Sequence, residues 1–302
     1  KKEREPIDFL SKKKVFFTIS LVLIAAGVIT IGVNAGRGKG AFAYSLEFQG
    51  GTSTNVTFDK DYSIDEIDKE IVPVVEKVTG DNNVQTQKVA GTNQVIIKTV
   101  TLDLDKREAL NKAMVDNFGV DESKITAENI SSTVSNEMRR DAVIAVVIAT
   151  ICMLLYIWFR FKDIRFATSA VLALLHDVLV VVGFYAIARI SVGNTFIACM
   201  LTIVGYSINA TIVIFDRIRE EMRGKTKSSD VAAVVNKSIT QTLTRSIYTS
   251  LTTFIMVAVL YVMGVSSIKE FALPLMVGVV CGAYSSVCIT GALWYVMKRF
   301  KK

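Results

Sequence analysis

Two adjacent ionisable residues, His176 and Asp177, lie near the middle of an apolar run that covers 166–188. If that run spans a membrane, each charged group costs about 2.5–3.5 kcal/mol on insertion scales, so the pair needs an explanation. Both side chains can change charge near neutral pH in a perturbed environment, which suits a proton or ion relay. A static polar contact between helices is the alternative. Successive helix residues point about 100° apart, so the two need not share one site.

Polar residues also interrupt the next apolar run, at Gly205, Tyr206, Ser207 and Asn209. Small residues allow helices to approach closely, and the amide of Asn209 can form hydrogen bonds across a helix interface. Arg245 stands at the entrance of a later run that is rich in Ser and Thr. Its side chain either extends to the membrane surface or faces inward to counter an acidic group. Asn209 and Arg245 are therefore further relay candidates.

The remaining chemistry-bearing residues form no catalytic or metal-binding pattern. Asp216 and Arg217 follow the polar run and are most simply a solvated, positively charged helix end, although Asp216 is retained as a relay candidate. The cysteines all lie in apolar runs without a CxxC pair, at Cys152, Cys199, Cys281 and Cys288. We interpret them as small buried hydrophobic residues. We therefore expect no enzyme activity, no metal site and no cofactor.

Six apolar stretches are long enough to cross a membrane, since a transmembrane helix needs roughly 20 mostly apolar residues. They cover 15–33, 141–159, 166–188, 195–215, 246–263 and 271–297. The first could be a cleaved signal peptide, because 33–35 resembles a cleavage site. Its apolar part exceeds the roughly 7–15 residues of a signal core, which favours an uncleaved anchor. The sequence predicts a polytopic α-helical membrane protein with six transmembrane helices.

Charge is distributed unevenly along the chain and predicts the orientation of these helices. Residues 35–138 contain 17 Asp and Glu against 11 Lys and Arg, whereas the whole chain has a net charge of +7. With a cytoplasmic N-terminus, the short cytoplasmic segments hold 20 Lys and Arg and the short outer loops hold 2. The positive-inside rule then makes both 1–14 and 298–302 cytoplasmic and 34–140 external. Because basic residues flank apolar runs instead of covering an aromatic-laced face, nucleic acid is not an expected partner.

The external block 34–140 is predicted to form an α+β domain. The elements expected in order are a strand at 52–58, a helix from the Ser63–Glu66 capping box to Gly80, strands at 83–90 and 94–101, a helix from Asp103 or Asp105 to Phe118, and a strand at 125–134. Pro73 should kink the first helix or end its first turn. The order β-α-β-β-α-β is typical of the ferredoxin-like fold, which by itself indicates no function.

Four segments together resemble a known family. They are Leu46–Thr52 with Phe48, Gly50 and Gly51, then Ala173–Val178, Gly205–Glu220 and Ser238–Ser246. Along essentially its whole length the chain resembles the SecF family, the smaller membrane subunits of bacterial SecD–SecF protein-export complexes. These complexes belong to the resistance-nodulation-division superfamily of proton-driven transporters. The segment GYSINATIVIFDRIRE is the most specific of the four.

The resemblance implies partners and a mechanism. A SecD-like subunit would complete a twelve-span unit in the bacterial cytoplasmic membrane that assists the SecY channel and the SecA motor. The external domains would engage the unfolded translocating polypeptide, and proton flow would drive their movement; sodium is the alternative ion. Many family members carry Asp after the fourth-helix Asn, whereas Ala210 follows Asn209 here. A titrating carboxylate would then come from the partner, with Arg245, Asn209 and Asp177 around it.

Two other functions stay open at this point. A lipid or drug exporter of the same superfamily would need a duplicated or dimeric arrangement, because six spans with one external domain are half of such a pump. A structural subunit without a coupling role of its own is the second alternative, and Ala210 keeps it open because alanine carries no proton.

Overall fold

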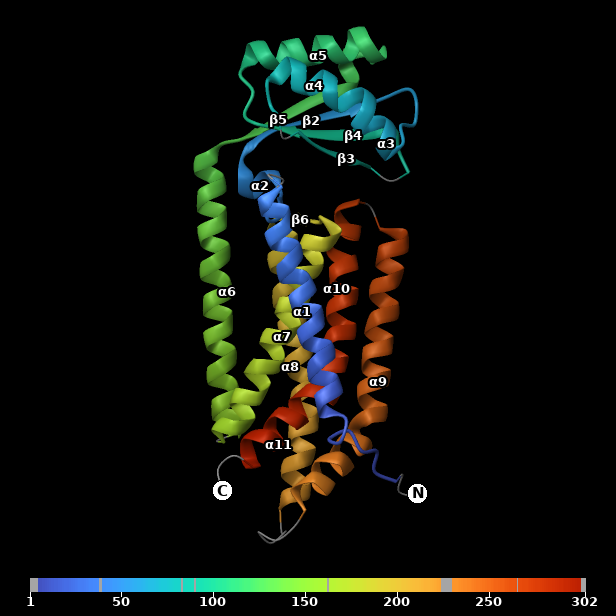
Figure 1. The fold of residues 1–302 in the computed structure, drawn as a ribbon. Coiled ribbons are helices and arrows are strands. Elements are labelled where there is room, and N and C mark those ends of the chain that lie inside the picture. The colour runs from blue at the N-terminus through green and yellow to red at the C-terminus, as the bar shows by residue number, and fades with distance from the viewer. Residues whose placement is uncertain are drawn as a thin grey trace.

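The computed structural model of the chain describes residues 5–37, 40–82, 84–89, 91–161, 163–223, 230–264 and 266–299. Within these ranges, six helices are long and apolar enough to cross a membrane, as the sequence predicts. They form one bundle that carries an α/β domain at one end, while the start of α1 and the end of α11 lie at the other end (Figure 1). The ends of the predicted strand 83–90 and parts of the terminal segments 1–14 and 298–302 lie outside the described residues.

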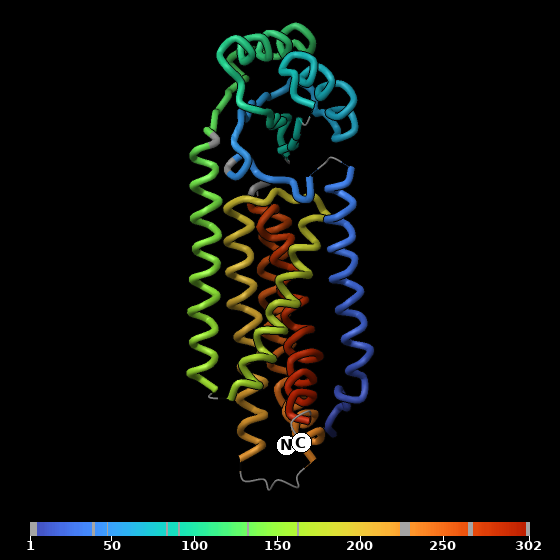
Figure 2. Tube along the Cα trace, turned by 60° about the vertical axis from the view of Figure 1, so that its left-hand side comes forward, coloured from blue at the N-terminus to red at the C-terminus, as the bar shows by residue number. Residues whose placement is uncertain are grey.

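The spanning helices differ in how deeply they are buried. In order they are α1 (Lys13–Gly36), α6 (Ser132–Phe161), α7 (Ile164–Ala188), α8 (Asn194–Met222), α9 (Val231–Met263), and α10 (Ser266–Tyr284), which continues through the π-helical η3 (Ser285–Thr290) into α11 (Gly291–Arg299). The apolar window of α7 is 50% buried and that of the last span 61%, against 6% for α6 and 11% for α9. α7 and α10 are therefore central, and Figure 2 shows α1 and α6 on opposite sides of them.

Two helices, α6 and α9, begin nine or more residues before the predicted apolar stretch. α9 begins at Val231 instead of near Ser246, with the Asp230 side chain accepting a hydrogen bond from the backbone N–H of Ala232 as an N-cap. α6 begins at Ser132, so the last strand of the domain ends at Ile130 and does not extend to 134. Hydropathy marks only the part of a helix that meets lipid, and a helix continues into polar sequence wherever its backbone hydrogen bonds are satisfied.

The α/β domain is one four-stranded sheet with helices on the face that points away from the bundle (Figure 1). Its elements are β2 (Gly51–Thr57), α3 (Ile64–Glu66), η1 (Ile67–Ile71), α4 (Val72–Thr79), β3 (Gln85–Lys88), β4 (Gln94–Thr99), α5 (Leu104–Phe118), η2 (Glu122–Lys124) and β5 (Ile125–Ile130). The strand order is β3-β4-β2-β5, and every neighbouring pair is antiparallel. Its core joins strand residues such as Val56 and Ile97 to helix residues such as Leu110.

Local sequence signals set the helix ends of this domain. Ser63 and Glu66 form the predicted capping box, and Asp103, not Asp105, caps α5 by accepting a hydrogen bond from the backbone N–H of Lys106. Gly80 and Gly119 end α4 and α5 in the left-handed conformation. Before Pro73 the helix widens to the π-helical η1, since proline has no N–H to donate and the hydrogen-bond ladder shifts there.

The segment with Phe48, Gly50 and Gly51 joins the domain to the bundle. It forms the short helix α2 (Leu46–Gln49) between β1 (Ala43–Tyr44) and β2. Phe48 is buried in a cluster with Val181 and Tyr185 of α7. Gly50 has a φ of 74°, and Gly51 has a φ of 127°. A Cβ on Gly51 would lie against the carbonyl oxygen of Thr99 on β4, so only glycine fits there.

Gly51→Ala is expected to loosen the junction between α2 and the sheet. The substitution combines a positive φ with a backbone clash, and we expect a loss of about 2 kcal/mol or more in local stability. Hydrogen exchange at the β2 and β4 amides should accelerate accordingly. Gly91→Ala is the matched control, because Gly91 also has a positive φ (79°) but no atom near the position of the added Cβ. Equal exchange in the two variants would contradict the steric explanation.

Candidate functional site: two polar clusters in the membrane bundle

Asp177 is the centre of a buried polar cluster. Its side chain is fully enclosed, and its Oδ2 accepts hydrogen bonds from the hydroxyls of Ser207 (2.5 Å) and Ser285 (2.7 Å). Its Oδ1 lies 2.9 Å from Nδ1 of His176 and 3.3 Å from Sγ of Cys281. Both carboxylate oxygens thus have partners, as a buried charge requires. We call these five residues the Asp177 cluster.

The Asp177 cluster joins three helices, α7, α8 and the α10–η3 unit. The helices approach closely because Gly278 and Gly282 on α10 face α8: a Cβ on Gly278 would meet the side chain of Ile203, and one on Gly282 would lie 3.4 Å from Cβ of Ser207. Ser285 is the first residue of the π-helical η3. π-helices are rare in proteins, and those that occur often lie at functional sites. His176 and Asp177, which the sequence did not require to share a site, share this one.

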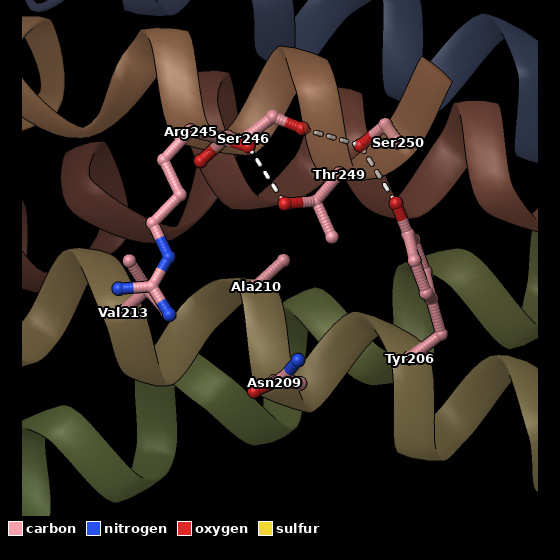
Figure 3. Close-up of a pocket in the computed structure, with 8 residues that line it drawn as sticks. All are labelled: Tyr206, Asn209, Ala210, Val213, Arg245, Ser246, Thr249 and Ser250. Atoms are coloured by element: carbon pink, nitrogen blue, oxygen red, sulfur yellow. Dashed lines mark hydrogen bonds between the residues drawn. The ribbon is translucent and has the colours of Figure 1, made fainter. Parts of the chain in front are cut away.

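Arg245 belongs to a second site, an open pocket between α8 and α9. Figure 3 shows its eight lining residues, which are Tyr206, Asn209, Ala210, Val213, Arg245, Ser246, Thr249 and Ser250. The Tyr206 hydroxyl donates a 2.7 Å hydrogen bond to Ser250 and bridges the two helices. Arg245 and Asn209 are exposed, and the guanidinium has no ion-pair partner among the residues that the structure describes. The pocket therefore offers a positive charge and polar groups toward the outside of the bundle.

The polar run 205–211 is divided between the two sites. Ser207 points to Asp177, whereas Tyr206 and Asn209 line the Arg245 pocket. Successive residues of a helix diverge by about 100°, so one short motif serves two faces. Gly205 differs from expectation, since a Cβ there would meet no atom within 4 Å in the described chain. Gly205 therefore makes no close helix contact with the described residues.

Asp216 and Arg217 belong neither to the Asp177 cluster nor to the residues that line the Arg245 pocket. Asp216 forms an ion pair of 2.8 Å with Arg160 of α6, and both side chains are about two-fifths exposed, at 39% and 40%. Arg217 donates hydrogen bonds to Glu220, Glu221 and Gln241, and so ties the end of α8 to the start of α9. These contacts agree with a solvated helix end and pair Asp216 with Arg160, not with a residue of the Asp177 cluster or the Arg245 pocket.

Sequence reasoning missed Cys281 and Ser285. They follow Asp177 by 104 and 108 residues, and no local pattern distinguishes them from other small residues of an apolar helix. The ligand atoms of His176, Asp177 and Cys281 all lie within 4.8 Å of one another, and all three residues are buried. The expectation of no metal site rested on spacing along the chain, which cannot reveal a cluster assembled from distant helices.

Six apolar helices with ionisable groups buried in their bundle define the class of the polytopic membrane proteins, in which such groups mark functional sites. Residues 110–300 match the family model described as "Protein export membrane protein SecD/SecF, C-terminal". The chain belongs to the SecD/SecF family of protein-export membrane proteins, as a SecF member. It is thus a multi-pass membrane protein of the Sec protein-transport pathway.

Individual relatives agree with this assignment. The protein translocase subunit SecF of Petrotoga mobilis is 36% identical over 98% of each chain. The protein translocase subunit SecDF of Bacillus subtilis is also 36% identical, and the match covers 96% of this chain but 38% of SecDF. The crystal structure of SecDF from Thermus thermophilus, a translocon-associated membrane protein, superposes with a TM-score of 0.83 at 30% identity, over 99% of this chain and 40% of SecDF. SecDF in its super-membrane-facing form gives a TM-score of 0.67.

Proposed function

We propose that this chain couples the proton motive force to a late step of preprotein translocation, together with a SecD-like membrane subunit. The observation that carries the proposal is the Arg245 pocket, a cationic and polar pocket that opens toward the outside of the bundle. Support for the partner comes from the SecDF relatives, in which the matching part makes up 38–40% of a longer chain. The remainder of such a chain supplies the surface against which this pocket would close.

The acidic group that pairs with Arg245 comes from the partner in this proposal. The pocket contains Asn209 and Ala210 but no carboxylate among its lining residues. A carboxylate beside an arginine keeps its charge more readily, and it accepts a proton more readily when the pair separates. Alternating contact of a partner carboxylate with Arg245 would therefore release and take up a proton on the two sides of the membrane.

The Asp177 cluster has a different role in this proposal. Asp177 is fully enclosed and its two oxygens are already occupied, so the cluster holds α7 against α8 and α10 while the pocket carries the exchange. Asp177 also fixes the orientation of the His176 ring, through the 2.9 Å contact between Oδ1 and Nδ1. Rigid central helices allow a small change at the α8–α9 surface to move the whole bundle as one body.

The domain 34–140 is assigned to the external face and to the ferredoxin-like class. The class is supported by the sheet order β3-β4-β2-β5 with two covering helices, and the orientation by the excess of Lys and Arg in the short segments at the opposite end. Both termini are then cytoplasmic in a bacterial cytoplasmic membrane. The domain would hold the unfolded polypeptide that emerges from the SecY channel and hinder its return, after SecA has driven it forward. No covalent chemistry is involved.

A purely structural subunit is the second candidate, and one observation favours it. Ala210 lines the same pocket as Arg245 and carries no group that could form an ion pair with it. Without that group the chain could stabilise a SecD-like partner and leave the coupling to it. Family membership weighs against the lipid or drug exporter.

Depletion of the protein in its own cell tests the export role. Pulse-chase labelling of secreted proteins should show uncleaved precursors that persist when the protein is absent, and collapse of the proton gradient should give the same delay. Re-expression of the full chain should restore processing, whereas a chain without residues 40–130 should not. Normal precursor processing after depletion would overturn the proposed function.

A further inference from the structure

Three side chains of the Asp177 cluster have the chemistry of metal ligands. His176, Asp177 and Cys281 offer an imidazole nitrogen, a carboxylate oxygen and a sulfur. The distance from Nδ1 to Oδ1 is 2.9 Å, from Sγ to Oδ1 3.3 Å, and from Sγ to Nδ1 3.9 Å. A tetrahedral Zn²⁺ with bonds of about 2.0–2.3 Å places its ligand atoms roughly 3.3–3.7 Å apart. Small rotations of the three side chains would therefore produce such a site.

The charge of this donor set suits a buried divalent cation. Cys281 and Asp177 contribute one negative charge each when deprotonated, and a neutral His176 contributes none, so a complex with Zn²⁺ has no net charge. Electrical neutrality matters here because a lone charge is expensive in the interior of a membrane bundle. Thiolate and imidazole also select zinc over the hard cations Mg²⁺ and Ca²⁺, which require oxygen ligands.

The surroundings provide what a metal site needs beyond its ligands. Ser207 and Ser285 donate hydrogen bonds to Oδ2 of Asp177, which leaves Oδ1 directed toward His176 and Cys281. Ligating carboxylates in metal sites are held by outer hydrogen bonds of this kind. Nε2 of His176 is buried without a hydrogen-bond partner among the described residues. A buried polar atom normally has such a partner, so the hydrogen bonds of the described chain do not explain why an imidazole is buried at this position.

We propose that His176, Asp177 and Cys281 form a Zn²⁺ site that links α7 to α10, with a hydroxyl of Ser285 or a water molecule as fourth ligand. His176 and Cys281 are 6% and 7% exposed, so the ion enters and leaves when the helices open locally and not through an open channel. Binding displaces the thiol proton from Sγ, and the single ring proton of the neutral His176 lies on Nε2, so that Nδ1 is free to bind the metal. The bound ion fixes α10, whose outer end reaches the α/β domain through a 2.7 Å hydrogen bond from Gln87 to Glu270.

The metal content of the full chain tests this site. The protein is purified in lipid nanodiscs, loaded with Zn²⁺, dialysed and analysed for zinc, and Co²⁺ is used in parallel as a spectroscopic probe. We expect about one zinc per chain and a thiolate-to-cobalt charge-transfer band. Cys281→Ser should remove the band and weaken zinc binding by more than the roughly 10- to 100-fold that loss of an outer-shell partner causes. Cys199→Ala, which removes another buried cysteine, should change neither the charge-transfer band nor the affinity for zinc.

A second measurement needs no variant and is independent of folding defects. Bound Zn²⁺ should protect Cys281 from alkylation in the wild-type chain, as read by mass spectrometry, and a chelator should remove that protection. The reactivity of Cys199 and Cys288 should not depend on the metal. Equal alkylation of Cys281 with and without Zn²⁺, or zinc retained by Cys281→Ser at the wild-type level, would overturn the proposal.

Discussion

Arg245→Ala is expected to reduce precursor processing to the level seen without the protein, and to remove its dependence on the proton gradient. Arg245 supplies the positive charge of the pocket, and truncating one member of a desolvated charge pair between partners costs about 2–5 kcal/mol of binding. Because the guanidinium forms no ion pair with the described part of this chain, the fold itself should lose only about 0.5 kcal/mol. Pulse-chase labelling with and without an uncoupler measures both effects.

Two further variants define the chemistry of this site. Arg245→Lys keeps the charge but loses the planar pair of donors that binds a carboxylate. We therefore expect a rate of precursor processing between those of the wild type and Arg245→Ala. Arg219→Ala is the matched control, because it removes an arginine from the charged end of α8, outside the pocket, and should process precursors normally. If precursor processing in Arg245→Ala still depends fully on the proton gradient, the coupling role of this chain is contradicted and the structural subunit is favoured.

Asp177→Ala is expected to cause the largest loss of stability of any substitution in the bundle, about 3–5 kcal/mol. The substitution leaves the Ser207 hydroxyl without its buried acceptor, the Ser285 hydroxyl with only the carbonyl of Gly282 at 3.3 Å, and His176 without its partner, and it opens a cavity between three helices. Thermal unfolding in detergent, followed by circular dichroism, should show a clearly lower midpoint. A chelator in the buffer removes any contribution from bound metal.

The ion pair at the end of the bundle provides the control for this prediction. Asp216→Ala breaks a contact with Arg160 in which both side chains are about two-fifths exposed, so we expect a loss of at most about 1 kcal/mol. Asp177→Asn should have an unfolding midpoint between those of Asp177→Ala and Asp216→Ala, since the amide keeps the shape of the side chain and one acceptor oxygen. Similar midpoints for Asp177→Ala and Asp216→Ala would mean that the buried hydrogen bonds contribute little.

Local sequence was sufficient for much of the architecture. Six apolar runs determine six helices because lipid-facing backbone must satisfy its own hydrogen bonds, whatever the neighbouring chain does. The capping box at Ser63 and the glycines Gly80 and Gly119 determine helix ends by the same local rule. Hydropathy failed at the start of α9, where the helix begins 15 residues before the predicted span in a segment of mixed apolar and polar residues, since hydropathy measures contact with lipid and not helix formation.

The sequence alone also singled out His176, Asp177, Asn209 and Arg245 as relay candidates, because a polar group in an apolar run is recognisable without a structure. Only the tertiary structure decided how they are grouped. It brought Cys281 and Ser285 to Asp177 from more than 100 residues away, and it placed Ser207 on a different face of α8 from Tyr206 and Asn209. The physical reason is that membrane depth is a property of each helix by itself, whereas a site depends on which helix faces meet, and that is set by packing between distant segments.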